Sequence, residues 1–132
     1  MAGTINERID IMKKNEKFYE GFWGEPSRTI RLVCNGVAIE EITTWHGYFD
    51  EIIRQIKPEE EGWTGLAYYY HLCIGWEDEE NWFIPDLPKA YEQLKWLDTH
   101  ALGETEKELL GLIVEMLETA IRLGGKVYIV EE

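Results

Sequence analysis

The chain has 132 residues, of which 45 % are hydrophobic and 13 % aromatic, a composition that fits a folded domain and excludes a disordered tail. It carries 26 acidic and 13 basic residues, and the resulting net charge of −13 repels nucleic acid phosphates and anionic membranes while favouring a basic partner. Its two cysteines are too few for a disulfide framework, and no apolar run reaches the roughly 18 residues of a membrane span.

The length predicts a single domain over residues 1–132, and the sequence shows no internal repeat or linker. The opening Met-Ala-Gly-Thr holds no apolar signal region, so we expect a cytoplasmic protein. The charge is uneven, because residues 1–57 have a net charge of −1 and residues 58–132 have a net charge of −12. This acidity has two interpretations: it selects a basic partner, or it only keeps the protein soluble.

The first predicted element is a helix over about residues 5–19. Thr4 and Glu7 have the spacing of a capping box, and apolar residues recur with helical periodicity as far as Tyr19. The lysine and glutamate side chains between them would then face solvent.

Residues 28–42 have the pattern of a β-hairpin. Asn35-Gly36 is the pair that best tolerates the two positive φ angles of a type I′ turn. A hairpin folded about this pair has one mostly apolar face, with Cys34 opposite Val37, Leu32 opposite Ile39 and Ile30 opposite Glu41. On the other face Arg31 lies opposite Glu40, and opposite charges at such positions help to fix the register.

Apolar residues at spacings of 3, 1, 3, 1 and 3 from Trp45 to Ile56 predict an amphipathic helix. Asp50 and Arg54 have the i,i+4 spacing of an ion pair on its solvent side. Residues 63–76 fit either a helix or a strand buried on both faces, because their three consecutive tyrosines have high β propensity. We favour the helix here.

The later elements are predicted as an extended segment at 82–85, a helix over about 87–98, a long apolar helix from Thr105 to a Gly124-Gly125 stop, and a strand over 126–130. Asp86 is a suitable N-cap for the first of these helices, and Thr105-Glu106-Lys107-Glu108 is a capping box for the second. Together the elements predict an α+β fold. A small, mainly antiparallel sheet, made of the 28–42 hairpin and the C-terminal strand, packs with four to five helices.

No catalytic or metal-binding motif stands out among the histidines and cysteines, which are His46, His71, His100, Cys34 and Cys73. His71 and Cys73 have the wrong spacing for a zinc pair, and residues i and i+2 do not face each other on a helix. Both cysteines fall on predicted apolar faces, where a thiol is unreactive. The sequence therefore predicts no catalytic residue, no metal and no cofactor.

Residues 75–86 alternate aromatic side chains with carboxylates. Hot spots of protein interfaces favour Trp and Tyr, and acidic groups around them select an Arg- or Lys-rich partner. We therefore assign a partner-binding site to Trp76, Glu77, Asp78, Glu79, Glu80, Trp82 and Asp86. In the alternative interpretation, Trp76, Trp82 and Phe83 only cover the core beneath a solvated acidic loop.

The stretch that begins Gly75-Trp76-Glu77, continues through Trp82-Phe83-Ile84-Pro85-Asp86-Leu87 and ends at Leu97 resembles small acidic immunity proteins of bacteria. Those proteins neutralise a cognate toxin domain, often a nuclease, in contact-dependent inhibition and related polymorphic-toxin systems. The resemblance implies a non-enzymatic inhibitor that occludes the basic substrate-binding face of a toxin domain. A nucleic-acid mimic that blocks a defence nuclease is a related form of the same hypothesis.

The competing hypothesis is a small-molecule-binding or enzymatic domain with an aromatic pocket near Trp63, Tyr68, Tyr70 and His71. The inhibitor hypothesis predicts carboxylates exposed on one contiguous face. The pocket hypothesis predicts a concave apolar site with a few converging polar groups, one of them a histidine or carboxylate with a shifted pKa.

Overall fold

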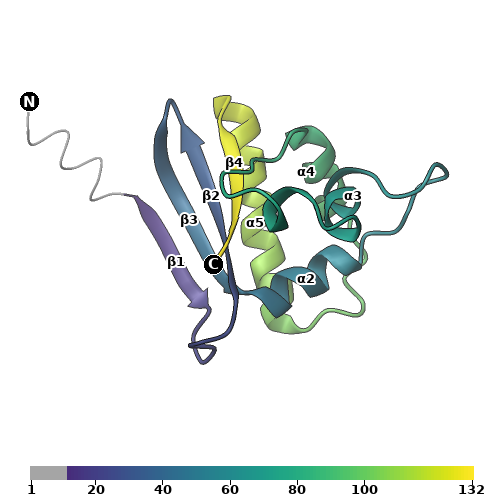
Figure 1. The fold of residues 1–132 in the computed structure, drawn as a ribbon, viewed down its shortest axis with the longest axis horizontal. Coiled ribbons are helices and arrows are strands. Elements are labelled where there is room, and N and C mark those ends of the chain that lie inside the picture. Colours follow the sequence, from purple (N-terminus) through teal and green to yellow (C-terminus); the bar gives the residue numbers. More distant parts are fainter. Residues whose placement is uncertain (1–11) are drawn as a thin grey trace, which may run out of the picture.

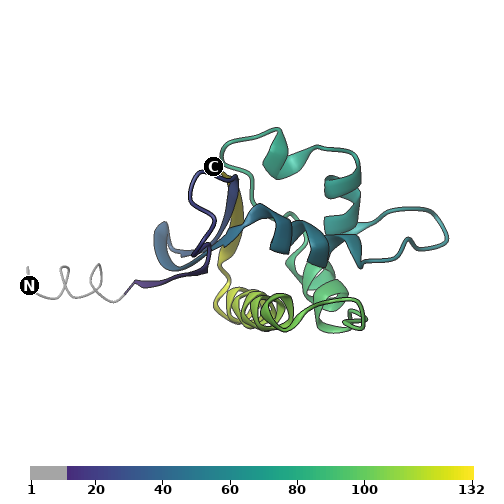
Figure 2. The same cartoon turned by 90° about the horizontal axis from the view of Figure 1, so that it is seen from below.

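A four-stranded mixed sheet with helices on one face forms the frame of the structure, a computed structural model that describes residues 12–132 (Figure 1). The elements in chain order are β1 (Lys13–Phe18), β2 (Ser27–Cys34), β3 (Val37–Trp45), α2 (His46–Arg54), α3 (Gly65–His71), the 3₁₀ turn η1 (Gly75–Glu77), α4 (Leu87–Lys95), α5 (Glu104–Leu123) and β4 (Lys126–Glu131). The strands lie in the order β1-β3-β2-β4, and helices α2 to α5 lie on the same side of the sheet (Figures 1 and 2). The predicted α+β fold is confirmed, although the sheet is mixed because β1 pairs with β3 in parallel.

The hairpin of β2 and β3 turns at Asn35-Gly36, whose φ angles of 51° and 76° are those of the predicted turn. Its register follows the prediction at Cys34 and Val37 but shifts at a β-bulge that leaves Ile39 unpaired. Beyond the bulge the predicted pairs are wrong by one residue: Leu32 lies opposite Glu40, Arg31 opposite Glu41, and Ile30 opposite Ile42. The shift puts two fully buried isoleucines side by side instead of an isoleucine and a glutamate.

Strand β1 replaces the last part of the helix predicted over residues 5–19. The capping box and residues 5–11 of that prediction lie outside the described residues, but residues 13–18 are extended and pair with β3. The strand places Lys13 and Lys14 beside Glu40 and Glu41, and it buries Phe18 to 2 % exposure. Pairing with the sheet therefore outweighs the helical periodicity, and lysines are common on edge strands such as this one.

The hydrophobic core lies between the inner face of the sheet and the helices. Helix α5 has six buried side chains: Leu109, Leu110, Ile113, Met116, Leu117 and Ala120. It ends at Gly124, which has a left-handed φ of 68°, as the predicted stop requires. Its capping differs from the prediction, because the helix begins at Glu104 and the Glu106 carboxylate accepts a hydrogen bond from the Gly103 amide. In the described part of the chain, no helix has both the length and the apolarity needed to cross a membrane.

After residue 62, the helices and strands have the predicted type, but several differ in length from the prediction. Residues 65–71 form the short helix α3, so the helical alternative for 63–76 holds for half of that stretch. Cys73 then takes a left-handed φ of 56° and turns the chain into η1. Helix α4 begins as predicted after Asp86, whose carboxylate accepts a hydrogen bond from the Lys89 amide at 3.1 Å.

The bulge turns Glu40 toward the core face of the sheet, opposite Leu32. Its side chain is 18 % exposed, and the Lys13 Nζ lies 3.8 Å from its carboxylate. Burial raises the pKa of Glu40 above its ordinary value, an effect that Lys13 partly offsets and that the charge of Glu115 reinforces. The ionised form of this carboxyl group is therefore disfavoured in the folded protein.

We predict that Glu40→Gln raises the stability of the protein near neutral pH. A carboxyl group whose pKa is higher in the folded than in the unfolded state binds more protons when folded, so its contribution to the free energy of unfolding falls as the pH rises through the folded pKa. Glutamine removes this penalty. The melting temperature should therefore exceed that of the wild type at about pH 7, and the difference should vanish below about pH 4.

Thermal unfolding across this pH range provides the measurement. Glu61→Gln is the matched control, because it removes the same charge from an exposed position. A Glu40→Gln variant that melts at or below the wild-type temperature at neutral pH would show that the contact with Lys13 outweighs the cost of burial.

Candidate functional site

The acidic loop, residues 77–81, begins at the last residue of η1 and carries four consecutive exposed carboxylates, Glu77 to Glu80. Two buried tryptophans close its ends: Trp76 is 2 % exposed and Trp82 is 7 % exposed, and their ring centroids lie 5.4 Å apart. Trp76 also packs edge-to-face on Phe49 of α2, at 5.6 Å. Because both ends are packed into the core, the loop is a short projection with a defined position.

Backbone contacts fix the loop further. Gly75 has a φ of 86°, and a Cβ atom there would lie 3.0 Å from the Trp82 ring, so the position requires glycine. Its carbonyl oxygen accepts hydrogen bonds from the amides of Asp78 and Glu79, at 3.0 and 2.8 Å. After the loop, residues 82–84 run beside β4 and form backbone hydrogen bonds with it, which confirms the predicted extended segment.

An open hollow of about 200 Å³ lies between the acidic loop and the end of β4, lined by Trp76, residues 77–80 and Glu131. Within residues 12–132, Asp78, Glu79 and Glu80 have no salt-bridge partner. Within this part of the chain their charges are therefore not compensated by an ion pair.

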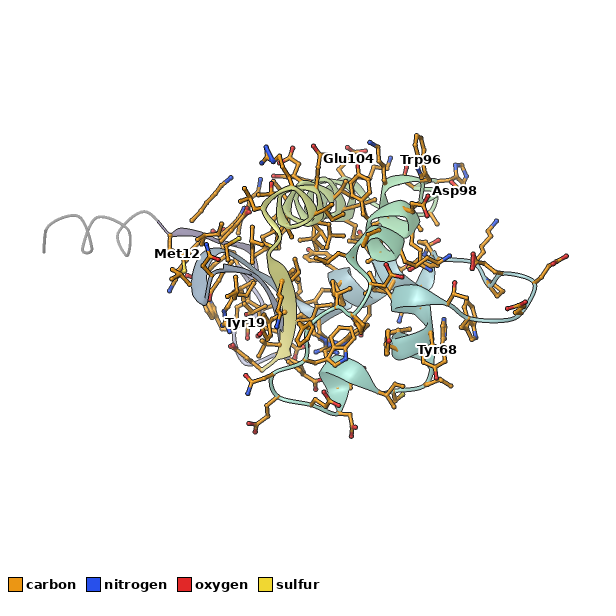
Figure 3. All side chains as sticks on the ribbon, turned by 90° about the horizontal axis from the view of Figure 1, so that it is seen from above. Met12, Tyr19, Tyr68, Trp96, Asp98 and Glu104 are labelled. Atoms are coloured by element: carbon orange, nitrogen blue, oxygen red, sulfur yellow. The ribbon has the colours of Figure 1, made fainter. Side chains whose placement is uncertain are left out.

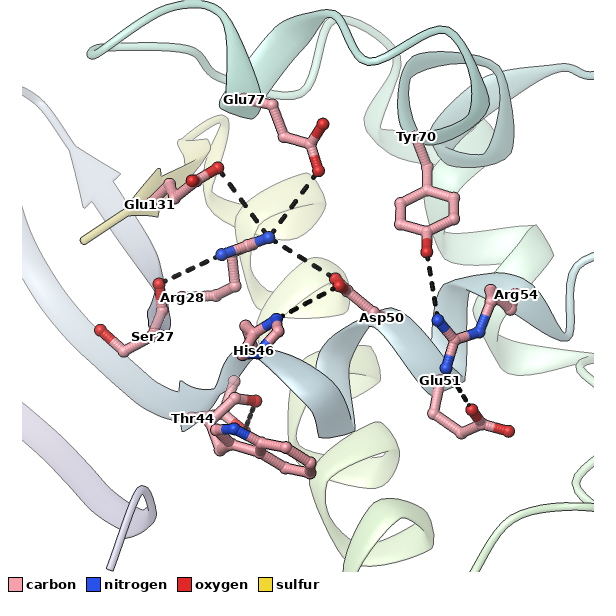
Figure 4. A network of polar contacts seen from close by, with 11 residues as sticks. Ser27, Arg28, Thr44, His46, Asp50, Glu51, Arg54, Tyr70, Glu77 and Glu131 are labelled. Carbon is pink, nitrogen blue, oxygen red and sulfur yellow. Dashed lines mark hydrogen bonds and ion pairs between the residues drawn. The ribbon is translucent and has the colours of Figure 1, made fainter. Parts of the chain in front are cut away.

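A buried arginine, Arg28, contacts two of the carboxylates that line this hollow. Its side chain is 5 % exposed, and its Nη2 lies 3.8 Å from carboxylate oxygens of Asp50 and Glu77 and 3.9 Å from one of Glu131 (Figure 4). These residues belong to β2, α2, η1 and β4, so a single guanidinium links four elements. We call this group the Arg28 cluster.

Strand alternation explains why Arg28 points inward. Alternate residues of a strand point to the same face, so Arg28 shares a face of β2 with the buried Ile30 and Leu32. It lies opposite Glu131 on β4. Glu131 in turn shares a face of β4 with the buried Ile129. The inner face of the sheet is therefore apolar along most of its length and ends in a pair of opposite charges.

The Arg28 cluster acts mainly through charge. Its contacts of 3.8–3.9 Å are longer than direct hydrogen bonds, and Arg28 Nε and Asp50 Oδ1 are buried without a hydrogen-bond partner among the described residues. Charges attract more strongly where water is excluded, and removing one partner leaves the others uncompensated. Each carboxylate is thus held in place by attraction to the same cation.

The predicted i,i+4 pair between Asp50 and Arg54 is wrong. Asp50 is 15 % exposed and turns toward Arg28, with His46 Nδ1 3.5 Å from its second oxygen. Arg54 instead pairs with Glu51, three residues before it. The buried guanidinium attracts Asp50 more strongly than an exposed arginine because screening by water is weaker there.

The predicted site residues separate into three groups. Glu77 to Glu80 lie together on the acidic loop as expected, whereas Trp76 and Trp82 are core residues and do not present their rings to a partner. Their alternative interpretation, as cover for the core, describes these two side chains correctly. Asp86 caps α4 and does not line the hollow. The aromatic side chain that reaches the surface in this stretch is Phe83, which is 38 % exposed, because it alternates with the buried Trp82 and Ile84.

The four residues predicted for the aromatic pocket of the competing hypothesis make different contacts. The rings of Trp63 and His71 stack on each other with centroids 3.8 Å apart. The Tyr70 hydroxyl accepts a hydrogen bond from Arg54. Tyr68 lines a separate recess of about 300 Å³ between α3 and α4, together with residues that include Thr64, Ile84, Asp86 and Lys89.

Histidine, cysteine and carboxylate side chains do not gather into a metal site anywhere in residues 12–132. Cys73 is exposed, which corrects its predicted place on an apolar face. The negative charge of Glu77, and a hydrogen bond to it, raise the pKa of the Cys73 thiol. A raised pKa keeps the thiol protonated, and a protonated thiol is a poor nucleophile.

We predict that Arg28→Met destabilises the protein by about 3 kcal/mol. This value is the lower end of the range for removing one partner of a buried ion pair. We expect the lower end because Glu77 and Glu131 keep some contact with water. Arg31→Met is the matched control. Arg31 lies three residues along the same strand and pairs with Glu41, but its side chain is 32 % exposed, so its loss should cost at most about 1 kcal/mol. Denaturant unfolding gives both values. Equal losses for the two variants would contradict the special role of Arg28.

Comparisons of the chain with family models, with curated proteins and with solved structures find no match. The chemistry and geometry of the acidic loop and the Arg28 cluster are therefore the basis for a functional assignment.

Proposed function

We propose that this protein is a non-enzymatic inhibitor that binds the basic surface of a partner protein through its acidic loop. The observation that carries the proposal is a group of three carboxylates, Asp78, Glu79 and Glu80, that have no salt-bridge partner among residues 12–132 and lie on a loop whose two ends are packed into the core. A preorganised loop loses little conformational entropy on binding, and its charges meet the partner in one arrangement.

The other acidic loop, around residues 59–61, is chemically different. The Glu59 carboxylate accepts hydrogen bonds from Lys89 Nζ and from the Thr64 hydroxyl, both at 2.7 Å. These bonds lower the pKa of Glu59 and raise that of Lys89. Part of its charge therefore stabilises the contact between this loop and α4, which leaves the loop at 77–81 as the stronger candidate for binding.

The uneven charge supports a basic protein as the partner. Residues 58–132 carry most of the net charge of −13, and such a field repels nucleic acid and accelerates encounter with a basic surface. Next to the loop, the exposed ring of Phe83 offers apolar contact area, with Lys126 Nζ 4.4 Å from its centroid on one side. Aromatic side chains of this kind anchor many protein interfaces.

More specifically, we propose that the protein is an immunity protein. Surfaces that bind nucleic acid are rich in Lys and Arg, so an acidic loop that occupies the substrate-binding face of a nuclease would exclude its substrate. We propose a cytoplasmic protein that neutralises such a toxin domain and needs neither a cofactor nor a metal. This proposal rests on the acidic loop and on the resemblance of residues 75–97 to immunity proteins.

We predict that Glu79→Lys/Glu80→Lys slows association with the partner about tenfold or more at low ionic strength, because reversed charges replace attraction with repulsion. Glu77 is left unchanged since it belongs to the Arg28 cluster. Glu60→Lys/Glu61→Lys is the matched control, with the same change of net charge on the other acidic loop. The partner is captured from the organism that encodes the chain, and association rates are then measured by stopped flow.

The difference between the two variants should shrink as added salt shortens the range of the field toward roughly 8 Å. Two results would contradict the proposal. Equal association rates for the two variants would show that the acidic loop is not the interface. A captured nuclease that keeps its full activity in the saturated complex would show that the protein binds without inhibiting.

A further inference from the structure

A second recess lies on the face of the sheet opposite the helices. Its volume is about 670 Å³, and its floor is formed by the outward side chains of β2 and β3. These include the pair Thr29 and Thr43, whose hydroxyl oxygens are 3.1 Å apart, and the ion pair of Arg31 with Glu41. The segment between β1 and β2, residues 19–26, forms the wall. Its size is within the range of small-molecule sites.

The wall is held by a hydrogen bond and by ring contacts, and it carries an exposed tryptophan. The Tyr19 hydroxyl donates a hydrogen bond to the Glu25 carbonyl at 2.6 Å, and Phe22 stacks on Trp45 with centroids 4.4 Å apart. Trp23 packs edge-to-face with Tyr19, at 5.1 Å and 86°, yet 74 % of it remains exposed. Figure 3 shows Tyr19 beside the sheet, far from Tyr68 and Trp96 among the helices. The two perpendicular rings form an aromatic corner at the mouth of the recess.

The charges around this corner are mainly negative. Four carboxylates line the recess, namely Glu16, Glu25, Glu41 and Glu132, against the two cations Lys14 and Arg31. Arg31 is already paired with Glu41, and within residues 12–132 the other three carboxylates have no salt-bridge partner. An anionic ligand would be repelled, whereas a cation would be attracted both by the carboxylates and by the faces of the aromatic rings.

We propose that this recess binds an organic cation, an alkylammonium or guanidinium group, at the corner of Tyr19 and Trp23. The cation lies against the face of the indole ring, and the carboxylates of Glu16 and Glu25 accept its hydrogen bonds. The same chemistry is offered by a free amine and by a Lys or Arg side chain of a peptide. This inference does not depend on the acidic loop, which lies on the other side of the sheet.

The test uses the whole chain with ¹⁵N-labelled tryptophan and follows its indole N–H signals by NMR. The probes are agmatine, a free compound with a guanidinium and an ammonium group, and an acetylated Gly-Arg-Gly amide as a peptide. The same peptide with citrulline in place of arginine has nearly the same shape without the charge. Trp96 is the internal control, since it is 77 % exposed at the end of α4. We expect a saturable shift of the Trp23 signal with both guanidinium probes and little shift of Trp96.

Two pairs of variants complete the test. Trp23→Ala should weaken the binding of agmatine about threefold or more, whereas Trp96→Ala should not. Because the Trp23 signal is lost in the first variant, binding is also measured by calorimetry. Glu25→Gln should weaken binding about twofold or more, in contrast to the exposed Glu20→Gln, which does not line the recess. Binding of the peptide would show that the recess accepts an Arg side chain, whereas binding of agmatine without the peptide would restrict it to free cations, and either result supports the proposal.

Three results would overturn it. Equal affinity for the citrulline and arginine peptides would show that the recess takes neutral polar ligands. Equal shifts of Trp23 and Trp96 would show diffuse attraction to an acidic surface rather than a site. A Trp23→Ala variant that binds agmatine with unchanged affinity in calorimetry would show that the aromatic corner does not bind the cation.

Discussion

The position of the acidic loop depends on one buried positive charge, that of Arg28. Arg28 lies on the inner face of the sheet, where burial of an unpaired cation would cost several kcal/mol. Carboxylates from α2, η1 and β4 compensate it, and each of them is held near the guanidinium in return. The position of the acidic loop therefore follows from the need to neutralise Arg28 as much as from the packing of its two buried tryptophans.

This arrangement separates the carboxylates of the loop into two roles. Glu77 belongs to the fold, because it neutralises Arg28, while Glu79 and Glu80 project from the fixed loop without a partner in the described chain. Unpaired like charges on one loop cost some stability through mutual repulsion, and under the proposed function they would speed and orient the encounter with a basic surface. The recess on the opposite face of the sheet combines acidity with exposed aromatic rings instead, and we therefore propose different cationic ligands for the two faces.

Sequence patterns predicted the elements whose signals are local and missed those that depend on partners distant in the chain. Asn35-Gly36 identified the turn because its φ angles are a property of those two residues. The bulge at Ile39 was missed because the register depends on burying Ile30 against Ile42, and β1 was missed because its pairing partner lies about 27 residues away. The alternation of Arg28 with Ile30 and Leu32 was a usable signal for the buried cluster, but only the fold brings its carboxylates together.

The exchange rate of the Arg28 Hε proton with water tests the central claim most directly. A guanidinium that is buried and surrounded by three carboxylates can exchange this proton only when the structure opens. NMR of ¹⁵N-arginine-labelled protein allows comparison with Arg122, which is exposed on α5. We predict that the Arg28 Hε proton exchanges at least about a hundredfold more slowly than the Hε proton of Arg122. Equal exchange rates for the two protons would show that Arg28 is open to water and does not hold the acidic loop in place.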